Sequence, residues 1–308
     1  MIKFLTVATR AGRLAVAQTQ IVISAIKVAC PDMEIEIKKV ITSGDRDRRT
    51  ALWNLRDSGF FTSQVEDAVL TGQADFAVHS FKDLPTRQSK GLTIPAVLDR
   101  RFPEDCLIAA KPVTALERLA KGSKVGTSSL RRVAQLRYLR PDLHPVSIRG
   151  NILTRLRQLE TGKVDAVILA RAGVERIGLG WRISFCFDPT QFIPAPAQGA
   201  LAVQAGKDNT TACGLLTEIN DEMVRIATLA ERQVLIKMQC GCHAPVGAFA
   251  EYCDEGITIT AFIADVQGTT MIRRQITGPA AKATTLADQI ASELLDAGGK
   301  EILQSQNT

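Results

Sequence analysis

Hydrophobic positions in the first hundred residues follow, in turn, the spacing of strands and of helices. Residues 3–8 form a short apolar run, and apolar positions from 14 to 28 recur at the three- and four-residue steps of a helix. Residues 34–41 alternate polar and apolar side chains, as a half-buried strand does. Ser63 and Glu66 have the spacing of a capping box, which predicts that a short helix opens there. Residues 75–78 predict a buried strand.

The same alternation starts again near residue 124. A short strand leads into Gly126, the next helix runs through Tyr138, and Asn151 is placed to cap a further helix before the apolar strand 164–169. Beyond about residue 221 the order changes to a long helix, 223–237, then strands near 248–252, 257–264 and 270–277, and a last helix from residue 280. We therefore predict two α/β units with mostly parallel sheets and a smaller C-terminal α+β domain.

The composition is typical of a folded protein and indicates the cellular compartment of the chain. Apolar residues make up 45% and charged residues 23% of the 308 residues. No apolar run reaches the roughly 18 residues of a membrane span, and the N-terminus is too short in apolar residues for a secretory signal. The seven cysteines, an odd number, favour reduced thiols over a disulfide framework. These features predict a cytoplasmic protein without a membrane partner.

Positive charge is concentrated between residues 121 and 182. This segment holds thirteen Lys and Arg against four Asp and Glu, a local net charge of +9 compared with +6 for the whole chain. Most of these bases are arginines, whose planar guanidinium groups suit carboxylates and phosphates. The segment therefore predicts an anionic ligand. A nucleic acid is the weaker alternative, because Tyr138 and Trp181 are the only aromatic residues of the segment and no recognised nucleic-acid motif occurs.

Polar residues follow three predicted strands at their carboxyl ends, the edge at which open α/β sheets bind ligands. They are residues 79–83, 126–129 and 149–151. From these three strand ends we predict a cleft between the two α/β units, lined by arginines and helix N-termini.

Each candidate motif also has a purely structural interpretation. Residues 126–132 are either an anion site at a helix start or a solvated basic helix capped by serine. Asp83 is either a turn residue before Pro85 or a carboxylate that binds N–H groups and moves protons. Cys242, in a Cys-Gly-Cys-His loop, is a candidate nucleophile. The spacing of that loop matches a zinc site poorly, so we expect no metal.

Six motifs, in one order over nearly the full chain, resemble the porphobilinogen deaminase family. They are residues 79–85 (HSFKDLP), 126–132 (GTSSLRR), 149–156 (RGNILTRL), 169–176 (LARAGVER), 194–200 (PAPAQGA) and 241–247 (GCHAPVG). Each motif alone is moderately specific, and the six together in this order are highly specific.

The resemblance implies a three-domain fold and a covalent cofactor. Two α/β domains similar to type II periplasmic binding proteins would cover residues 1–98 with 199–218 and residues 104–193, and a smaller α+β domain would cover 219–308. Cys242 would form a thioether to a dipyrromethane primer. Four porphobilinogen molecules would be added with loss of ammonia, and hydrolysis would release linear hydroxymethylbilane. The resemblance implies a monomeric, cytoplasmic transferase of tetrapyrrole biosynthesis whose product passes to uroporphyrinogen-III synthase.

The resemblance also assigns residues to the reaction. Asp83 matches the catalytic aspartate, which would hydrogen-bond pyrrole N–H groups and stabilise positive charge as ammonia leaves. Every added ring brings an acetate and a propionate, and their uncompensated burial would be costly, which accounts for the many arginines. The residues implied to bind the cofactor, besides Cys242 and Asp83, are Ser80, Lys82, Thr127, Ser128, Ser129, Arg131, Arg132 and Gly150. Those implied to bind substrate are Arg10, Arg149, Arg155, Arg176 and Gln198.

The chain departs from the family pattern at three positions and adds one thiol. Gly12 stands where the family has a serine, and Asn54 and Ser58 stand where it has lysines. Cys240 is a second thiol two residues from Cys242. We expect nearby arginines to compensate for the lost cations, the candidates being Arg13, Arg46, Arg48, Arg49 and Arg56. Two alternatives stay open: a degenerate enzyme inactivated by these changes, and a non-catalytic anion-binding protein of the periplasmic-binding type, which would leave the cysteine loop unexplained.

Overall fold

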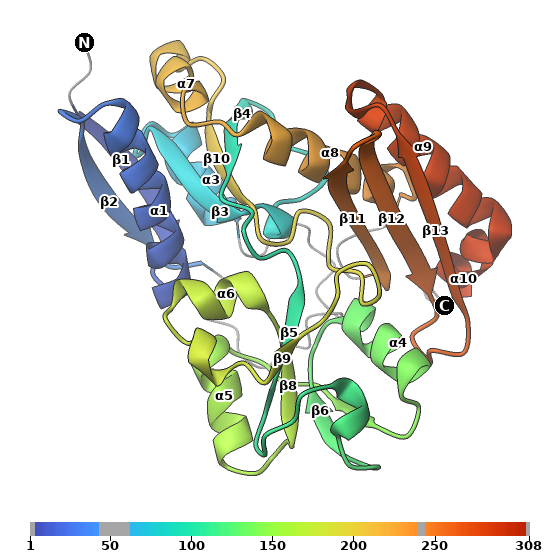
Figure 1. Ribbon diagram of the computed structural model, residues 1–308. Helices are drawn as coiled ribbons and strands as arrows, with labels where there is room; N and C mark the ends of the chain where they lie inside the picture. Colours follow the sequence, from blue (N-terminus) through green and yellow to red (C-terminus); the bar gives the residue numbers. More distant parts are fainter. Residues whose placement is uncertain (1–3, 43–61, 240–243, 306–308) are drawn as a thin grey trace. The chain divides into compact units, whose positions relative to one another are not determined.

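The computed structural model describes residues 4–42, 62–239 and 244–305, and Figure 1 shows the three sheets that they form. The chain divides into two compact units, each of them discontinuous. One contains Met1–Arg101 with Gly199–Arg225, and the other contains Phe102–Gln198 with Ile226–Thr308. The predicted division into three domains stays a prediction; its second domain and most of its third, from Ile226 on, lie inside one compact unit.

The first unit is a five-stranded sheet with helices on both faces. Its strand order is β2-β1-β3-β10-β4. The strands are β1 (Phe4–Arg10), β2 (Glu34–Val40), β3 (Phe76–Ser80), β4 (Leu92–Leu98) and β10 (Leu201–Gly206). The helices are α1 (Arg13–Ala29), α3 (Ser63–Leu70) and α7 (Thr210–Thr217). Alternate side chains of β1 and β3 point to opposite faces, so that Val7 and Phe76 pack with α1 and α7, whereas Ala8 and Ala77 pack with α3.

The second unit contains a similar sheet of order β7-β6-β8-β5-β9. The strands are β5 (Asp105–Ala109), β6 (Lys124–Gly126), β7 (His144–Val146), β8 (Ala166–Ala170) and β9 (Phe185–Cys186). Helix α4 (Leu130–Leu139) covers one face, and α5 (Ile152–Glu160) with α6 (Arg171–Arg176) covers the other. The α/β prediction is confirmed. The expectation of mostly parallel sheets agrees with the strand directions, since four strands of each sheet run the same way. The exceptions are β10 in one sheet and β5 in the other, which pair antiparallel with both of their neighbours.

A three-stranded antiparallel sheet completes the second unit. It consists of β11 (Val246–Cys253), β12 (Gly256–Ala264) and β13 (Met271–Gly278). The helices α8 (Glu222–Lys237), α9 (Ala283–Leu294) and α10 (Lys300–Ser305) belong to the same region. One face of β12 packs on α8 and α9 through Ile259 and Ile263, and the other packs through Phe262 on Ala134 of α4. The central strand is therefore buried on both faces.

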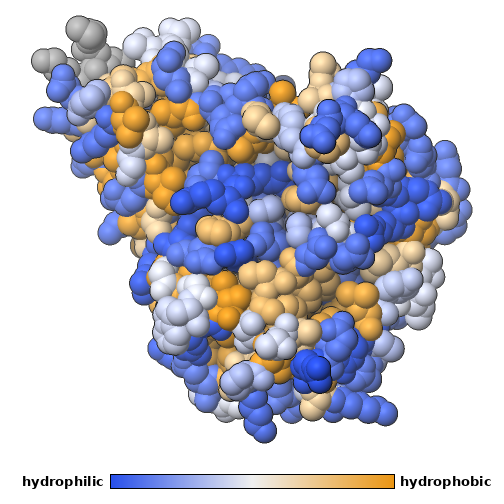
Figure 2. Space-filling view, viewed as in Figure 1, coloured by the Kyte–Doolittle hydropathy of each residue, from blue (hydrophilic) through white to orange (hydrophobic). Residues whose placement is uncertain are grey.

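The outer strand of this sheet is polar where it meets solvent. Arg273, Arg274 and Gln275 of β13 are exposed, and the surface over β13 is largely hydrophilic in Figure 2. Charged side chains on an edge strand discourage pairing with another chain.

The remaining turns and one predicted cap complete the description. Short 3-10 turns cover Phe81–Asp83, Leu116–Arg118, Gly180–Arg182 and Ala280–Lys282, and a π-helical turn covers Leu295–Gly299. The capping box at Ser63 is wrong: Ser63 is already helical, and Glu66 turns away to accept hydrogen bonds from the Ser89 hydroxyl at 2.8 Å and from Gln204 Nε2 at 2.9 Å. Among the described residues, no helix is long and apolar enough to cross a membrane.

Candidate functional site

Two of the predicted strand ends lie together in the second unit, because β6 and β7 are parallel neighbours. The backbone N–H of Thr127 donates to the Val146 carbonyl oxygen at 2.9 Å. The Ser128 hydroxyl lies 3.2 Å from that of Ser147 and donates to the Ile148 carbonyl oxygen. Gly126 fits closely here, since a Cβ would lie 2.7 Å from Ile148 Cδ1 and the Ile148 side chain would have to shift. The loops after β6 and β7 are therefore joined by hydrogen bonds at the carboxyl edge of the sheet, and Thr127 and Ser128 are buried there.

The loop after β7 is built for close approach of the backbone. Gly150 has φ +98°, and a Cβ there would meet the Thr154 side chain at 2.7 Å, so glycine is favoured by both conformation and space. The Asn151 side chain accepts the Thr154 N–H at 2.9 Å, which confirms the predicted cap of α5. Arg155, one turn further along the helix, donates from Nε to the Gly150 carbonyl oxygen at 2.9 Å.

Three arginine charges act on one another at this edge. Burial, together with the positive charges of Arg132 and Arg149, lowers the pKa of Arg155 to about 10. The Nη1 group of Arg149 is buried and has no hydrogen-bond partner in the described structure. A buried guanidinium donor without a partner is costly, and an anion would supply the missing acceptor. The residues present therefore fit a ligand that carries carboxylates.

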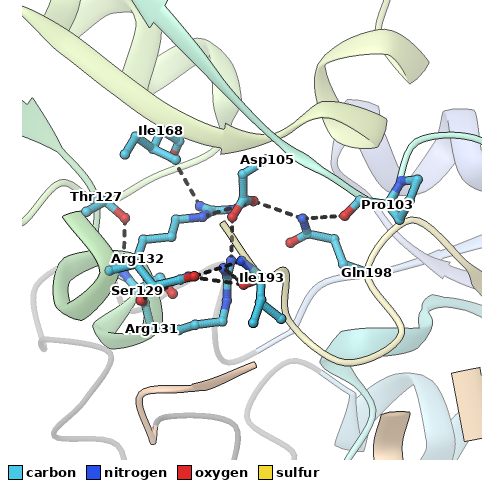
Figure 3. A network of polar contacts seen from close by, with 10 residues as sticks. Pro103, Asp105, Thr127, Ser129, Arg131, Arg132, Ile168, Ile193 and Gln198 are labelled. Atoms are coloured by element: carbon cyan, nitrogen blue, oxygen red, sulfur yellow. Dashed lines mark hydrogen bonds and ion pairs between the residues drawn. The ribbon is translucent and has the colours of Figure 1, made fainter. Parts of the chain in front are cut away.

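Arg131 and Arg132, in the first turn of α4, form hydrogen bonds with a buried carboxylate. Arg131 Nη2 donates to Asp105 Oδ2 at 2.8 Å, and Arg132 Nη2 donates to Asp105 Oδ1 at 2.7 Å (Figure 3). Burial alone would raise the pKa of Asp105, but the charges of the two arginines outweigh it and the pKa lies well below its usual range. Ser129 precedes the pair at the helix start without a side-chain capping bond. The solvated-helix interpretation of this motif is therefore wrong, because both arginines are buried.

Gln198 belongs to the same network. Its Nε2 donates to Asp105 Oδ1 and to the Pro103 carbonyl oxygen, both at 2.9 Å (Figure 3). Sequence reasoning identified Gln198 and the arginines but missed Asp105. A signal was present, since two adjacent arginines in the first turn of a helix require a nearby negative charge. Nothing in the local pattern showed which carboxylate supplies it.

The first unit holds the remaining predicted residues that the structure describes. Asp83 ends the 3-10 turn after β3 and its side chain is exposed. Buried Phe81 anchors this turn, and its N–H donates to the Ala200 carbonyl oxygen at 3.0 Å. Ser80 is tied to α1, because its hydroxyl accepts a hydrogen bond from Gln18 Nε2 at 2.7 Å. Arg10 ends β1 and is half-buried, as is Lys82 in the turn.

The remaining predicted residues lie on α6 or outside the described residues. Arg176 ends α6 in the second unit and is half-buried. The candidate anchor Cys242 and the second thiol, Cys240, lie outside the described residues. The same holds for Asn54 and Ser58 and for the compensating arginines proposed in that stretch, which are Arg46, Arg48, Arg49 and Arg56. Within the described ranges, no group of three His, Cys, Asp or Glu side chains is placed to hold a metal ion.

His79 lies two residues before the 3-10 turn Phe81–Asp83 and is uncharged at neutral pH. It is buried on β3, and its Nε2 has no hydrogen-bond partner in the described structure. Burial lowers the pKa of His79 to about 4; Gln204 opposes the shift and the charge of Arg10 adds to it. The imidazole is therefore not a source of protons for a reaction near neutral pH.

This pKa predicts a measurable loss of stability in acid. Between pH 6.5 and 4 the unfolded chain binds a proton at His79 that the folded chain does not, so the free energy of unfolding falls as the pH decreases through this window. The total is about 3 kcal/mol for a shift of this size. Urea unfolding at pH 7 and pH 4.5 would show wild type losing more stability than His79→Gln. Equal losses in both proteins would contradict the assignment.

The fold and the site define a class: an α/β protein with arginines at the carboxyl ends of its strands, an arrangement that suits a carboxylate-bearing ligand. Two family profiles match the chain. They are "Porphobilinogen deaminase, dipyromethane cofactor binding domain" over residues 5–213 and "Porphobilinogen deaminase, C-terminal domain" over residues 225–296. The chain belongs to the porphobilinogen deaminase family. It is accordingly a transferase of tetrapyrrole biosynthesis that uses a dipyrromethane cofactor.

Relatives of similar length carry the same family name. The chain is 41% identical to a porphobilinogen deaminase of Desulforudis audaxviator, and the match covers 96% of each chain. It is 40% identical to one from a Roseiflexus species, over 97% of this chain and 98% of the relative. The family assignment therefore extends over all the predicted motifs, including the cysteine loop.

Solved structures with a similar fold are far more distant. The methionine-binding protein MetQ matches at a TM-score of 0.45 and 12% identity, over 72% of this chain and 92% of that one. A TRAP solute-binding protein from Pseudomonas putida F1, solved with D-glucuronate, matches at a TM-score of 0.41 and 13% identity, over 72% and 78%.

Proposed function

We propose that the chain is an active enzyme that assembles linear hydroxymethylbilane from four porphobilinogen molecules, with the residues that the six motifs indicate. The observation that carries this proposal is the cationic edge of the second unit. There the unpaired Nη1 of Arg149 and the lowered pKa of Arg155 mark a site with more positive than negative charge. A substrate with an acetate and a propionate on each ring supplies the missing negative charge.

The described residues fit the dipyrromethane cofactor in the same way. Its carboxylates would be held by Arg131 and Arg132, and Gly150 would let the loop backbone come close. Thr127, Ser128, Ser129, Ser80 and Lys82 complete the proposed set of binding residues. Cys242 would anchor the cofactor through a thioether. When bound, the dipyrromethane supplies the free pyrrole carbon to which new rings are added.

The other side chains divide the remaining tasks. Asp83 accepts hydrogen bonds from pyrrole N–H groups, and its negative charge stabilises the positive charge that develops as ammonia leaves. Arg149 and Arg155 bind the carboxylates of the incoming ring, and fixed guanidinium groups orient that ring for reaction. Arg10 and Arg176 serve the carboxylates of rings already added. The resemblance assigns Gln198 to the substrate.

The setting is part of the proposal. Arginine-rich binding of a small polycarboxylate needs neither a nucleic acid nor a membrane as partner. We propose a monomeric enzyme in the cytoplasm, where its free thiols stay reduced, and whose product passes to uroporphyrinogen-III synthase.

The first test is the intact mass of the purified protein. We expect wild type to carry added mass equal to two porphobilinogen units less two ammonia molecules, and Cys242→Ala to lack it because the thioether cannot form. Cys240→Ala is the matched control and should keep the added mass.

The other outcomes of this measurement separate the alternatives. If both cysteine variants keep the adduct, Cys240 or another group shares the anchoring role and the assignment of Cys242 is wrong. If wild type lacks the adduct even after incubation with porphobilinogen, the proposal that this chain is an active enzyme is wrong. An adduct without product formation would identify the degenerate enzyme.

A further inference from the structure

A single buried carboxylate, that of Asp105, organises the arginine pair of α4. Asp105 is the first residue of β5 and is 0% exposed. Because side chains alternate along a strand, it lies on the same face as Leu107, and this is the face that α4 covers. Its Oδ1 accepts from Arg132 Nε at 3.2 Å and Nη2 at 2.7 Å, and its Oδ2 accepts from Arg131 Nη2 at 2.8 Å. One side chain therefore holds both arginines.

The other donors of the two arginines are fixed by backbone carbonyls. Arg131 Nη1 donates to Ile193 at 2.6 Å, and Arg132 Nη1 donates to Ile168 at 3.1 Å. Gln135 holds Ile193 in turn, since its side chain accepts the Ile193 N–H at 2.7 Å and donates to the Ile193 carbonyl oxygen at 3.0 Å. Each guanidinium plane is thus set by at least two acceptors, and rotation of either side chain would break several bonds at once.

The neutralisation of the pair is incomplete. One carboxylate faces two arginines, and the positive charge of Arg132 is still felt at Arg155. Arg131 Nε is buried without a partner in the described structure. A second carboxylate in this position would cancel the attraction for anions, whereas an uncharged residue would leave two buried guanidinium groups to repel each other. One carboxylate for two arginines fixes their geometry and leaves net positive charge for a ligand.

Gln198 fixes the carboxylate itself. Its Nε2 joins Asp105 Oδ1 to the Pro103 carbonyl oxygen. Pro103 and Gln198 lie beside two of the three points at which the chain passes between its compact units, Arg101 to Phe102 and Gln198 to Gly199. Gln198 is also fully buried, so its described role is internal.

We propose that Asp105 is a positioning residue for carboxylate binding, that it acts through Arg131 and Arg132, and that Gln198 acts through Asp105 and not on the substrate. The proposal rests on the proposed function, since it assigns the two arginines to the carboxylates of the growing chain. It adds a residue that none of the six motifs contains.

The test compares Asp105→Asn with wild type in steady-state kinetics. Asn keeps the size of the side chain but loses its charge, so the arginines separate and present a less ordered site. We expect the KM for porphobilinogen to rise about tenfold, with a smaller change in kcat, as when binding interactions present before the chemical step are weakened. Asp142→Asn is the matched control, because it removes a 2.7 Å pair with Arg140 at the other end of α4, and its KM should be unchanged.

A second readout separates positioning from simple structural support. Melting temperatures are measured for Asp105→Asn with the cofactor attached and in a Cys242→Ala background without it. We expect the larger decrease in the cofactor-free protein, because the cofactor's carboxylates replace the missing negative charge between the arginines. Equal decreases, or an unchanged KM, would overturn the proposal.

Two further measurements keep the outcomes distinct. If Asp105→Asn does not fold, Gln198→Met decides: it leaves all charges in place, and we expect its KM to rise about threefold, whereas an unchanged KM refutes the proposal. Wild type in the same assay tests the proposed function. A wild type without turnover or adduct refutes that function, but a working wild type beside an unaffected Asp105→Asn refutes only the role of Asp105.

Discussion

Asp83→Asn is expected to lower kcat by about 100- to 10,000-fold, the range typical of removing a catalytic acid–base or charge-stabilising group. Asn keeps the shape of the side chain but cannot balance positive charge as ammonia leaves. The turn that carries Asp83 is anchored by buried Phe81 and Leu84, and Asp83 itself is exposed. The substitution should therefore leave the free energy of unfolding unchanged, so that the decrease in kcat reflects the chemical step and not loss of folded protein.

The measurement is the rate of hydroxymethylbilane formation by protein whose attached cofactor has been verified by intact mass. Asp67→Asn, an exposed aspartate of α3 in the same unit, is the control and should retain wild-type turnover. Asp83→Glu restores the charge at a displaced position and should recover part of the rate. Turnover of Asp83→Asn within tenfold of wild type, with the cofactor attached, would rule out the assigned role.

Glu231→Ala is expected to be the most destabilising of the substitutions considered, by about 2–6 kcal/mol, because it leaves two buried N–H groups without acceptors. Glu231 is a 0% exposed residue of α8. Its Oε2 accepts the Ala197 N–H at 2.7 Å and its Oε1 accepts the Ala250 N–H at 2.6 Å. Ala197 has φ +61°, a conformation that a non-glycine residue rarely adopts, so this hydrogen bond also holds a strained backbone.

Urea unfolding gives the loss directly from the shift in the transition midpoint. Glu231→Gln keeps one acceptor oxygen and should lose less than the alanine variant. Glu222→Ala removes an exposed glutamate from the first turn of the same helix and should change stability by less than about 0.5 kcal/mol. A loss for Glu231→Ala no larger than that of Glu222→Ala would show that the buried carboxylate is not the link between the 194–198 segment and β11.

The elements with a clear hydrophobic period were predictable from the sequence. Residues 14–28 and 34–41 predicted α1 and β2 closely, and Asn151 caps α5 as expected. These elements have one buried and one exposed face, so apolar and polar residues recur along the sequence with the period of a helix or a strand. The arginine motifs could also be identified from the sequence, because the excess of Lys and Arg over Asp and Glu between residues 121 and 182 can be counted directly.

The central antiparallel strands were not predictable in the same way. β5 and β10 are buried on both faces and therefore do not alternate, and β10 (LAVQAG) is rich in residues with weak strand preference. β4 contains Pro95, which argues against a strand; it is tolerated because β4 is an edge strand and its register with β10 shifts at this point.

The structural role of Asp105 was not predictable either, because it lies on β5, whose sequence shows no alternation of polar and apolar residues. A single aspartate between Glu104 and Cys106 has no local pattern that marks it as buried. Its role appears only when β5 enters its sheet antiparallel to β8 and places the start of the strand beside the N-terminus of α4. Long-range pairing of this kind is decided by the whole sheet and not by neighbouring residues.

The position of β10 in the first sheet has a consequence for synthesis on the ribosome. β10 lies between β3 and β4 and pairs with both, yet it is made after the entire 102–198 segment. About a hundred residues must be added first, which takes roughly 5–20 s at about 5–20 residues per second. During that time the nascent chain carries two apolar strands whose pairing edges are open, and these strands are natural targets for holding chaperones until the returning segment closes the sheet.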